Sequence, residues 1–110
     1  MVLTKQDKEA LFQIKQLIEK DYKTHYSIEY LAQAAFMSRS KLIKAYKVFF
    51  GMALYEHLQN YRLILGKKLL EDEALSIKEV AYQCGYKYPC NFSTAFKRKF
   101  GVSPEAYRRL

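Results

Sequence analysis

The apolar positions of this chain recur every three or four residues, which is the spacing of one face of an α-helix. The first run follows Thr4 and Asp7, which are spaced as in a capping box. Its apolar face consists of Leu11, Ile14, Leu17, Ile18 and Tyr22. Because residues 5–22 and 53–73 contain no proline, the pattern favours helices over a sheet with many turns. We therefore predict an all-α protein with about seven helices.

An internal repeat organises most of the remaining chain. Residues 27–51, SIEYLAQAAFMSRSKLIKAYKVFFG, align with residues 76–101, SIKEVAYQCGYKYPCNFSTAFKRKFG, with one extra residue in the second copy. Each copy predicts a short helix, a tight turn and a longer basic helix. The apolar stripe of that longer helix is Leu42, Ala45, Tyr46 and Phe49 in the first copy and Phe92, Ala95 and Phe96 in the second. This is the pattern of a helix-turn-helix, whose second helix can enter a major groove.

The segment between the copies predicts one continuous linker helix over residues 53–73. Its apolar positions, again at helical spacing, are Leu54, Leu58, Tyr61, Leu65 and Leu69. About twenty residues at ~1.5 Å each span roughly 30 Å, close to the ~34 Å of one DNA turn. We expect an N-terminal helix and first helix-turn-helix in residues 1–52, the linker in 53–73, and a second helix-turn-helix with a C-terminal helix in 74–110. Such a linker would let both recognition helices enter successive major grooves on one face of a duplex.

The net charge of +8 is unevenly distributed along the chain. Acids concentrate at residues 71–73, between two basic stretches. These stretches contain Arg39, Lys41, Lys44 and Lys47 in the first copy, and Lys87, Lys97, Arg98 and Lys99 in the second. Basic patches of this kind suit a polyanion, most often nucleic acid, although a charged run is by default a solvated face.

The two cysteines do not indicate a sulfur-dependent function. The chain has no apolar run of membrane-spanning length and no signal-peptide pattern, so we expect a cytoplasmic protein with reduced thiols and no membrane contact. With His25 and His57 distant from both cysteines, no zinc-ligand spacing appears, and we expect no metal or cofactor. We predict that Cys84 is a core residue and that Cys90 is a small side chain at the start of the second recognition helix.

The C-terminal residues 92–109, FSTAFKRKFGVSPEAYRR, resemble the signature of AraC/XylS-type transcription regulators. In that family F-x-x-x-F-K, F-G and P-x-x-Y-R follow at fixed spacing. The matching residues are Phe92, Phe96, Lys97, Phe100, Gly101, Pro104, Tyr107 and Arg108. With the repeat and the long helix between its copies, the resemblance covers the chain from about Leu11 to its end. It implies a DNA-binding domain of two helix-turn-helix subdomains that regulates transcription.

We expect the outward positions of the two longer helices to contact DNA. The expected base-reading residues are Ser40, Lys41, Ile43 and Lys44 in the first copy, and Cys90, Asn91, Ser93 and Thr94 in the second. The expected phosphate contacts are Arg39, Lys47, Lys87, Lys97 and Arg98. Thr94 stands where the family often has arginine, which argues against strong base readout by the second copy.

Three further features depart from the family pattern or bear on the core. Gly85 should end a short helix with left-handed backbone, and Phe36 falls at the same place in the first copy, where that geometry costs roughly 1–2 kcal/mol. Gly66 stands where the family usually has alanine and would allow close packing. We interpret five tyrosines as core and helix-contact residues rather than base-stacking platforms: Tyr22, Tyr26, Tyr30, Tyr82 and Tyr86.

The expected partner is double-stranded DNA. The resemblance adds two further partners: RNA polymerase, and an N-terminal effector-binding or dimerisation domain that is absent from this chain. Two alternatives share some of the features. A nonspecific architectural or RNA-binding module would have the basic patches, although single-strand binders expose their aromatic residues. An enzyme, such as a DNA-repair protein with this motif, would need a catalytic segment, and the repeat occupies nearly all of the chain.

Overall fold

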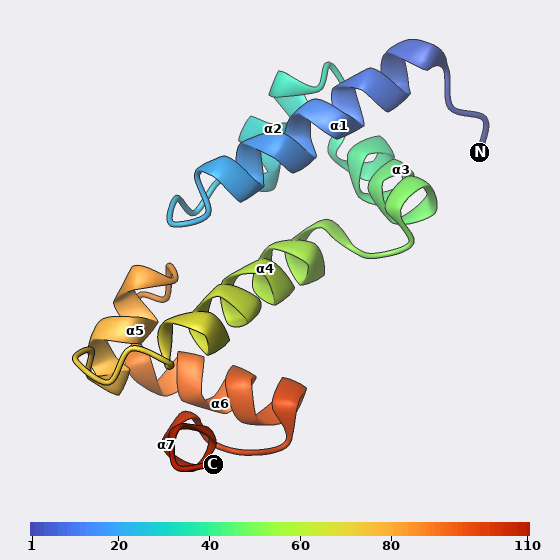
Figure 1. Ribbon diagram of the computed structural model, residues 1–110. Helices are drawn as coiled ribbons and strands as arrows, with labels where there is room; N and C mark the ends of the chain where they lie inside the picture. Colours follow the sequence, from blue (N-terminus) through green and yellow to red (C-terminus); the bar gives the residue numbers. More distant parts are fainter. The chain divides into compact units, whose positions relative to one another are not determined.

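The computed structural model describes residues 1–110, which form seven helices and no strands (Figure 1). The helices are α1 (Lys5–Lys20), α2 (Ile28–Ala34), α3 (Arg39–Phe50), α4 (Leu54–Leu69), α5 (Ile77–Gln83), α6 (Pro89–Phe100) and α7 (Pro104–Arg108). The all-α fold and the repeated pattern of a short and a longer helix are confirmed. None of the helices combines the length and the apolar character needed to cross a membrane.

The chain folds into two compact units, Met1–Leu58 and Gln59–Leu110. The division falls within α4, so the first turn of this helix belongs to one unit and the remainder to the other. Each unit has its own hydrophobic core and its own helix-turn-helix, formed by α2 and α3 in the first and by α5 and α6 in the second.

The core of the first unit joins α1 to its helix-turn-helix. The capping box at the start of α1 is formed, because the Thr4 side chain accepts a hydrogen bond from the Asp7 N–H and the Asp7 carboxylate accepts one from the Thr4 N–H. Tyr22 lies beyond the end of α1 but still packs against the core. The largest buried side chains of this unit are Leu11, Ile18, Leu31, Leu42 and Tyr46.

The core of the second unit depends on a close approach of α4 to α6. A Cβ built on Gly66 would lie 2.6 Å from Phe92 Cε1 and 3.2 Å from the Cys84 sulfur, so no larger residue fits without movement. Phe92 and Phe96 are fully buried, with ring centroids 5.6 Å apart. The expectation that Gly66 permits close packing is confirmed.

Helix α4 is shorter than the predicted linker of residues 53–73, since it ends at Leu69. Leu70 is buried, and a turn follows it, with the Asp72 N–H donating to the Leu69 carbonyl over 3.1 Å. Glu71 and Asp72 are acids, which the negative end of the helix macrodipole disfavours. The cation that this end of the helix favours comes from α7, where Arg108 donates to the carbonyl oxygens of Leu70 and Asp72, over 3.1 and 3.3 Å.

Candidate nucleic-acid interface

Helix α3 presents its polar and basic residues on the face opposite its core. The Ser38 hydroxyl accepts a hydrogen bond from the Lys41 N–H and starts the helix, and Gly51 ends it with a left-handed φ of 73°. Leu42, Ala45 and Tyr46 are buried, which fixes the rotation of the helix. The predicted residues that are exposed on α3 are Arg39, Ser40, Ile43, Lys44 and Lys47, whereas Lys41 is half-buried.

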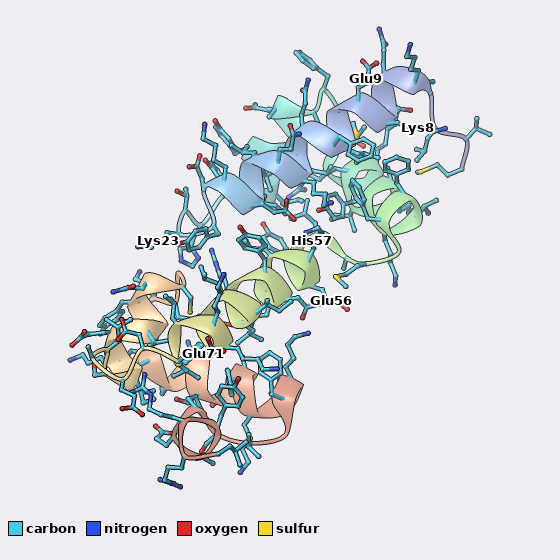
Figure 2. The ribbon with its side chains drawn as sticks, viewed as in Figure 1. Lys8, Glu9, Lys23, Glu56, His57 and Glu71 are labelled. Atoms are coloured by element: carbon cyan, nitrogen blue, oxygen red, sulfur yellow. The ribbon has the colours of Figure 1, made fainter.

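A hydrogen-bonded network contacts α3 on its buried side. The Tyr46 hydroxyl and His57 Nδ1 share a hydrogen bond of 3.0 Å, and His57 Nε2 lies 2.9 Å from a carboxylate oxygen of Glu19. Burial raises the pKa of Tyr46, with the Glu19 charge as a smaller cause. His57 stands near the start of α4 (Figure 2), so the network joins α1, α3 and α4 within the first unit. It gives α3 a fixed orientation.

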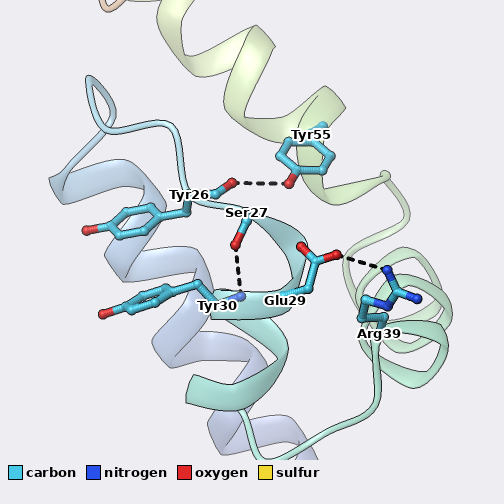
Figure 3. A network of polar contacts seen from close by, with 6 residues as sticks. All are labelled: Tyr26, Ser27, Glu29, Tyr30, Arg39 and Tyr55. Carbon is cyan, nitrogen blue, oxygen red and sulfur yellow. Dashed lines mark hydrogen bonds and ion pairs between the residues drawn. The ribbon is translucent and has the colours of Figure 1, made fainter.

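Two of the four cations on α3 are paired with acids of neighbouring elements. Arg39 Nη1 lies 2.9 Å from Glu29 Oε1 on α2 (Figure 3), and Lys41 Nζ lies 3.0 Å from Asp7 Oδ1 on α1. The pKa of Glu29 is lowered, first by its own backbone N–H and then by Arg39. The pKa of Asp7 is also lowered, first by the Thr4 N–H and then by the Lys41 hydrogen bond. Sequence reasoning missed both acids, because they come together with α3 only through the packing of three helices.

Helix α6 begins without a charged residue. Tyr88 takes the N-cap position without a side-chain hydrogen bond, and Pro89 follows at the first helical position, where its missing N–H is tolerated. With Phe92 and Phe96 buried, the exposed predicted residues of this region are Lys87, Cys90, Asn91, Thr94, Lys97 and Arg98, while Ser93 is half-buried. Lys97 and Arg98 lie in the last turn, where the macrodipole favours cations, and neither makes an ion pair.

The two cysteines differ in their environment, as predicted. Cys84 is fully buried, and its thiol lies 3.5 Å from the Ala81 carbonyl oxygen. Cys90 is exposed near the start of α6, with its sulfur 3.8 Å from the side-chain oxygen of Asn91. Neither cysteine forms a disulfide.

Two of the five tyrosines are exposed and are not core residues. Tyr30 is 53% exposed and Tyr82 is 45% exposed. Tyr26 stacks on Tyr30 with ring centroids 5.2 Å apart, and the Tyr55 hydroxyl donates to the Tyr26 carbonyl (Figure 3).

Comparison with known proteins agrees with this geometry. The model of the family described as "Helix-turn-helix domain" matches residues 31–110. The HTH-type transcriptional regulator MtrA of Neisseria gonorrhoeae is 34% identical over 104 residues, which cover 94% of this chain and 34% of that protein. The chain spans about a third of the length of the curated relatives it matches.

Two solved structures are similar over nearly the whole chain. The DNA-binding domain of the global transcriptional factor AdpA, in complex with a target DNA, superposes with a TM-score of 0.83 at 30% identity, covering 90% of this chain and 89% of that one. The C-terminal domain of AraT, a response regulator from Geobacillus stearothermophilus, gives a TM-score of 0.82 at 31% identity, covering 99% and 88%. The fold and these matches define a duplicated helix-turn-helix domain. The chain belongs to the AraC/XylS-type helix-turn-helix family.

Proposed function

We propose that this chain binds double-stranded DNA sequence-specifically through α3 and α6 and thereby regulates transcription. One observation carries the proposal: each unit exposes a polar, cationic face on the second helix of a helix-turn-helix whose other face is buried. A helix of this kind can enter a major groove. The similarity to the AdpA domain, whose structure is in complex with a target DNA, supports DNA binding here.

Side chains of different chemistry take different roles in this proposal. Lys44 can reach guanine O6 and N7, Asn91 can bond adenine N6 and N7, and Ile43, which is 52% exposed, can contact a thymine methyl group. The remaining proposed base-contacting positions are Ser40, Lys41, Cys90, Ser93 and Thr94. The cations that position the protein on phosphates are Arg39, Lys47, Lys87, Lys97 and Arg98.

The two helices are proposed to occupy successive major grooves. Helix α4 is one uninterrupted helix that contributes residues to both units. Half-sites on one face of a duplex are about 10 base pairs apart. The proposed target is therefore asymmetric, with two short elements at that spacing.

Regulation is proposed to involve partners outside this chain. The relatives it matches are about three times as long, which leaves room in such proteins for an effector-binding or dimerisation domain. We propose such a domain, located N-terminally, and RNA polymerase as partners, and the cytoplasm as the compartment.

Selection of bound duplexes from a random library tests the proposal. We expect enrichment of a two-element sequence and a Kd that weakens steeply with salt, because phosphate contacts release counterions. Titration of the selected duplex, its single strand and an RNA duplex at matched salt is the control. Equal affinity for all three, or no enriched sequence, would show an architectural or RNA-binding module instead.

A further inference from the structure

The cations of α3 fall into two groups that differ in their neighbours. Arg39 and Lys41 lie in the first turn, and both are paired with acids. Lys44 and Lys47 lie one and two turns further along the helix, are exposed, and make no ion pair. Two of the four cations of this helix are thus neutralised by acids. Both lie in the first turn, the end of the helix that is expected to approach the bases.

The pairing acids belong to two separate elements. Glu29 reaches from the first turn of α2, and its side chain remains 60% exposed, like that of Arg39 at 64%. Asp7 belongs to the first turn of α1; its side chain is only 13% exposed, and the Thr4 N–H also holds it. Each carboxylate is therefore preplaced next to its cation.

Stability alone does not explain this arrangement. An exposed ion pair such as Arg39–Glu29 contributes only about 0–1 kcal/mol, and both Arg39 and Lys41 are cations in a first helical turn, where they oppose the macrodipole. Arg39 and Lys41 would be stronger phosphate contacts without their acids, since a phosphate must compete with a carboxylate already in place. Helix α6 shows no such masking, because Lys97 and Arg98 are unpaired.

We propose that Glu29 and Asp7 are specificity-determining residues that mask Arg39 and Lys41 from the phosphate backbone. Nonspecific affinity comes almost entirely from neutralised phosphates, whereas sequence discrimination comes from base contacts. Masking weakens the phosphate contact proposed for Arg39 and prevents Lys41, a proposed base-contacting residue, from adding a phosphate contact of its own. It therefore lowers the nonspecific affinity and leaves sequence discrimination to the proposed base-contacting residues of α3: Ser40, Lys41, Ile43 and Lys44. This inference rests on the proposed DNA binding and adds which acids set the balance between specific and nonspecific affinity.

The test compares Glu29→Gln and Asp7→Asn with the parent chain on a mixed-sequence duplex. Freeing one cation should steepen the slope of log K against log[salt] by about 0.9. Between about 50 and 200 mM salt, the affinity of each variant should then fall about threefold more than that of the parent. On the duplex selected from the library, the ratio of specific to nonspecific affinity should fall. The amide introduced by Asp7→Asn keeps an oxygen that can accept from the Thr4 N–H, so the cap of α1 is retained.

Glu9→Gln is the matched control. Glu9 is an exposed acid on α1 (Figure 2) that makes no ion pair, and its removal changes the net charge by the same amount. It should leave the salt slope close to that of the parent. Adding Arg39→Gln to Glu29→Gln should return the slope to the parent value, since the freed cation is gone.

The outcomes separate this inference from the proposed function. If Glu29→Gln and Asp7→Asn behave as Glu9→Gln does, the masking role is wrong while DNA binding stands. If the parent chain binds no duplex, the proposed function itself is wrong. Circular dichroism of each variant should match the parent, which would exclude a folding defect as the cause of a changed slope.

Discussion

Phe36 and Gly85 occupy the same position in the two helix-turn-helix turns and share an unusual backbone. Phe36 has a φ of 55° and Gly85 a φ of 101°. Glycine adopts this region without steric cost, whereas a side chain costs roughly 1–2 kcal/mol. The Phe36 ring is 96% exposed, so little apolar burial offsets that cost. The repeat therefore has a strained first turn and a relaxed second one.

Phe36→Gly should stabilise the first unit. Relief of the left-handed backbone outweighs the extra freedom that glycine gives the unfolded chain, for a net gain of about 0.5–1 kcal/mol. Chemical denaturation measures the change. Gly85→Ala, the reverse exchange in the second unit, should destabilise. A less stable Phe36→Gly variant would mean that the ring makes contacts whose loss exceeds the strain.

Gly66→Ala should destabilise the second unit, although alanine is the better helix former by about 1 kcal/mol. Its Cβ would lie 2.6 Å from Phe92 Cε1, and Phe92 is fully buried and cannot retreat. Overpacking of a core costs about 1–3 kcal/mol, which leaves a net loss of up to about 2 kcal/mol. Lys68→Ala, at an exposed position of the same helix, is the control and should be nearly neutral. An unchanged melting temperature for Gly66→Ala would show that α4 and α6 are free to move apart.

At the scale of helices, sequence patterns predicted the features that depend only on residues close to one another in the chain. The capping box at Thr4, the left-handed Gly85 and the buried Cys84 all follow from residues close in sequence. Features that depend on distant residues could not be predicted. One such feature is the end of α4 at Leu69. The Leu70 carbonyl that follows it is contacted by Arg108, which lies 38 residues further along the chain.

The same limit applies to the candidate interface. The outward positions of α3 and α6 could be predicted from the buried stripe alone, and most of them are exposed. The acids that pair with Arg39 and Lys41 could not be predicted in this way, because Glu29 is separated from Arg39 by a turn and Asp7 comes from another helix. Periodicity shows which face is free but not which charges on it are already paired. That these positions contact DNA stays a prediction.

Arg108→Ala should destabilise the second unit by about 1–2 kcal/mol, because two carbonyl oxygens after the end of α4 lose a charged donor. Arg108→Lys should recover little of the loss, since an ammonium group does not reproduce the planar guanidinium fork. Arg109→Ala is the neighbouring control at an exposed position and should be neutral. Thermal unfolding measures all three. Equal effects at the two arginines would point to net charge rather than to the capping contact.

At the scale of the whole molecule, duplication gives two helix-turn-helix units of unequal chemistry. The exposed face of α3 has cations along its length, whereas α6 has Cys90 and Asn91 near its start and its cations in the last turn. Lysine can bond guanine O6 and N7, whereas asparagine can bond adenine N6 and N7. The two units should therefore prefer different sequences, and a target for this chain should not be palindromic.

The spacing proposed for the two elements of the target rests on α4, which is a single helix with residues in both units. Its 16 residues at ~1.5 Å each extend roughly 24 Å. Five base pairs inserted between the elements turn one to the opposite face of the duplex, and ten restore the face but add about 34 Å. Since a helix cannot lengthen by that amount, both insertions should reduce affinity to that of a single element. Gel-shift titration of the three duplexes measures this, with a duplex carrying one scrambled element as the reference. A ten-pair insertion that binds as tightly as the selected site would mean that the units are joined flexibly and that α4 does not set the spacing.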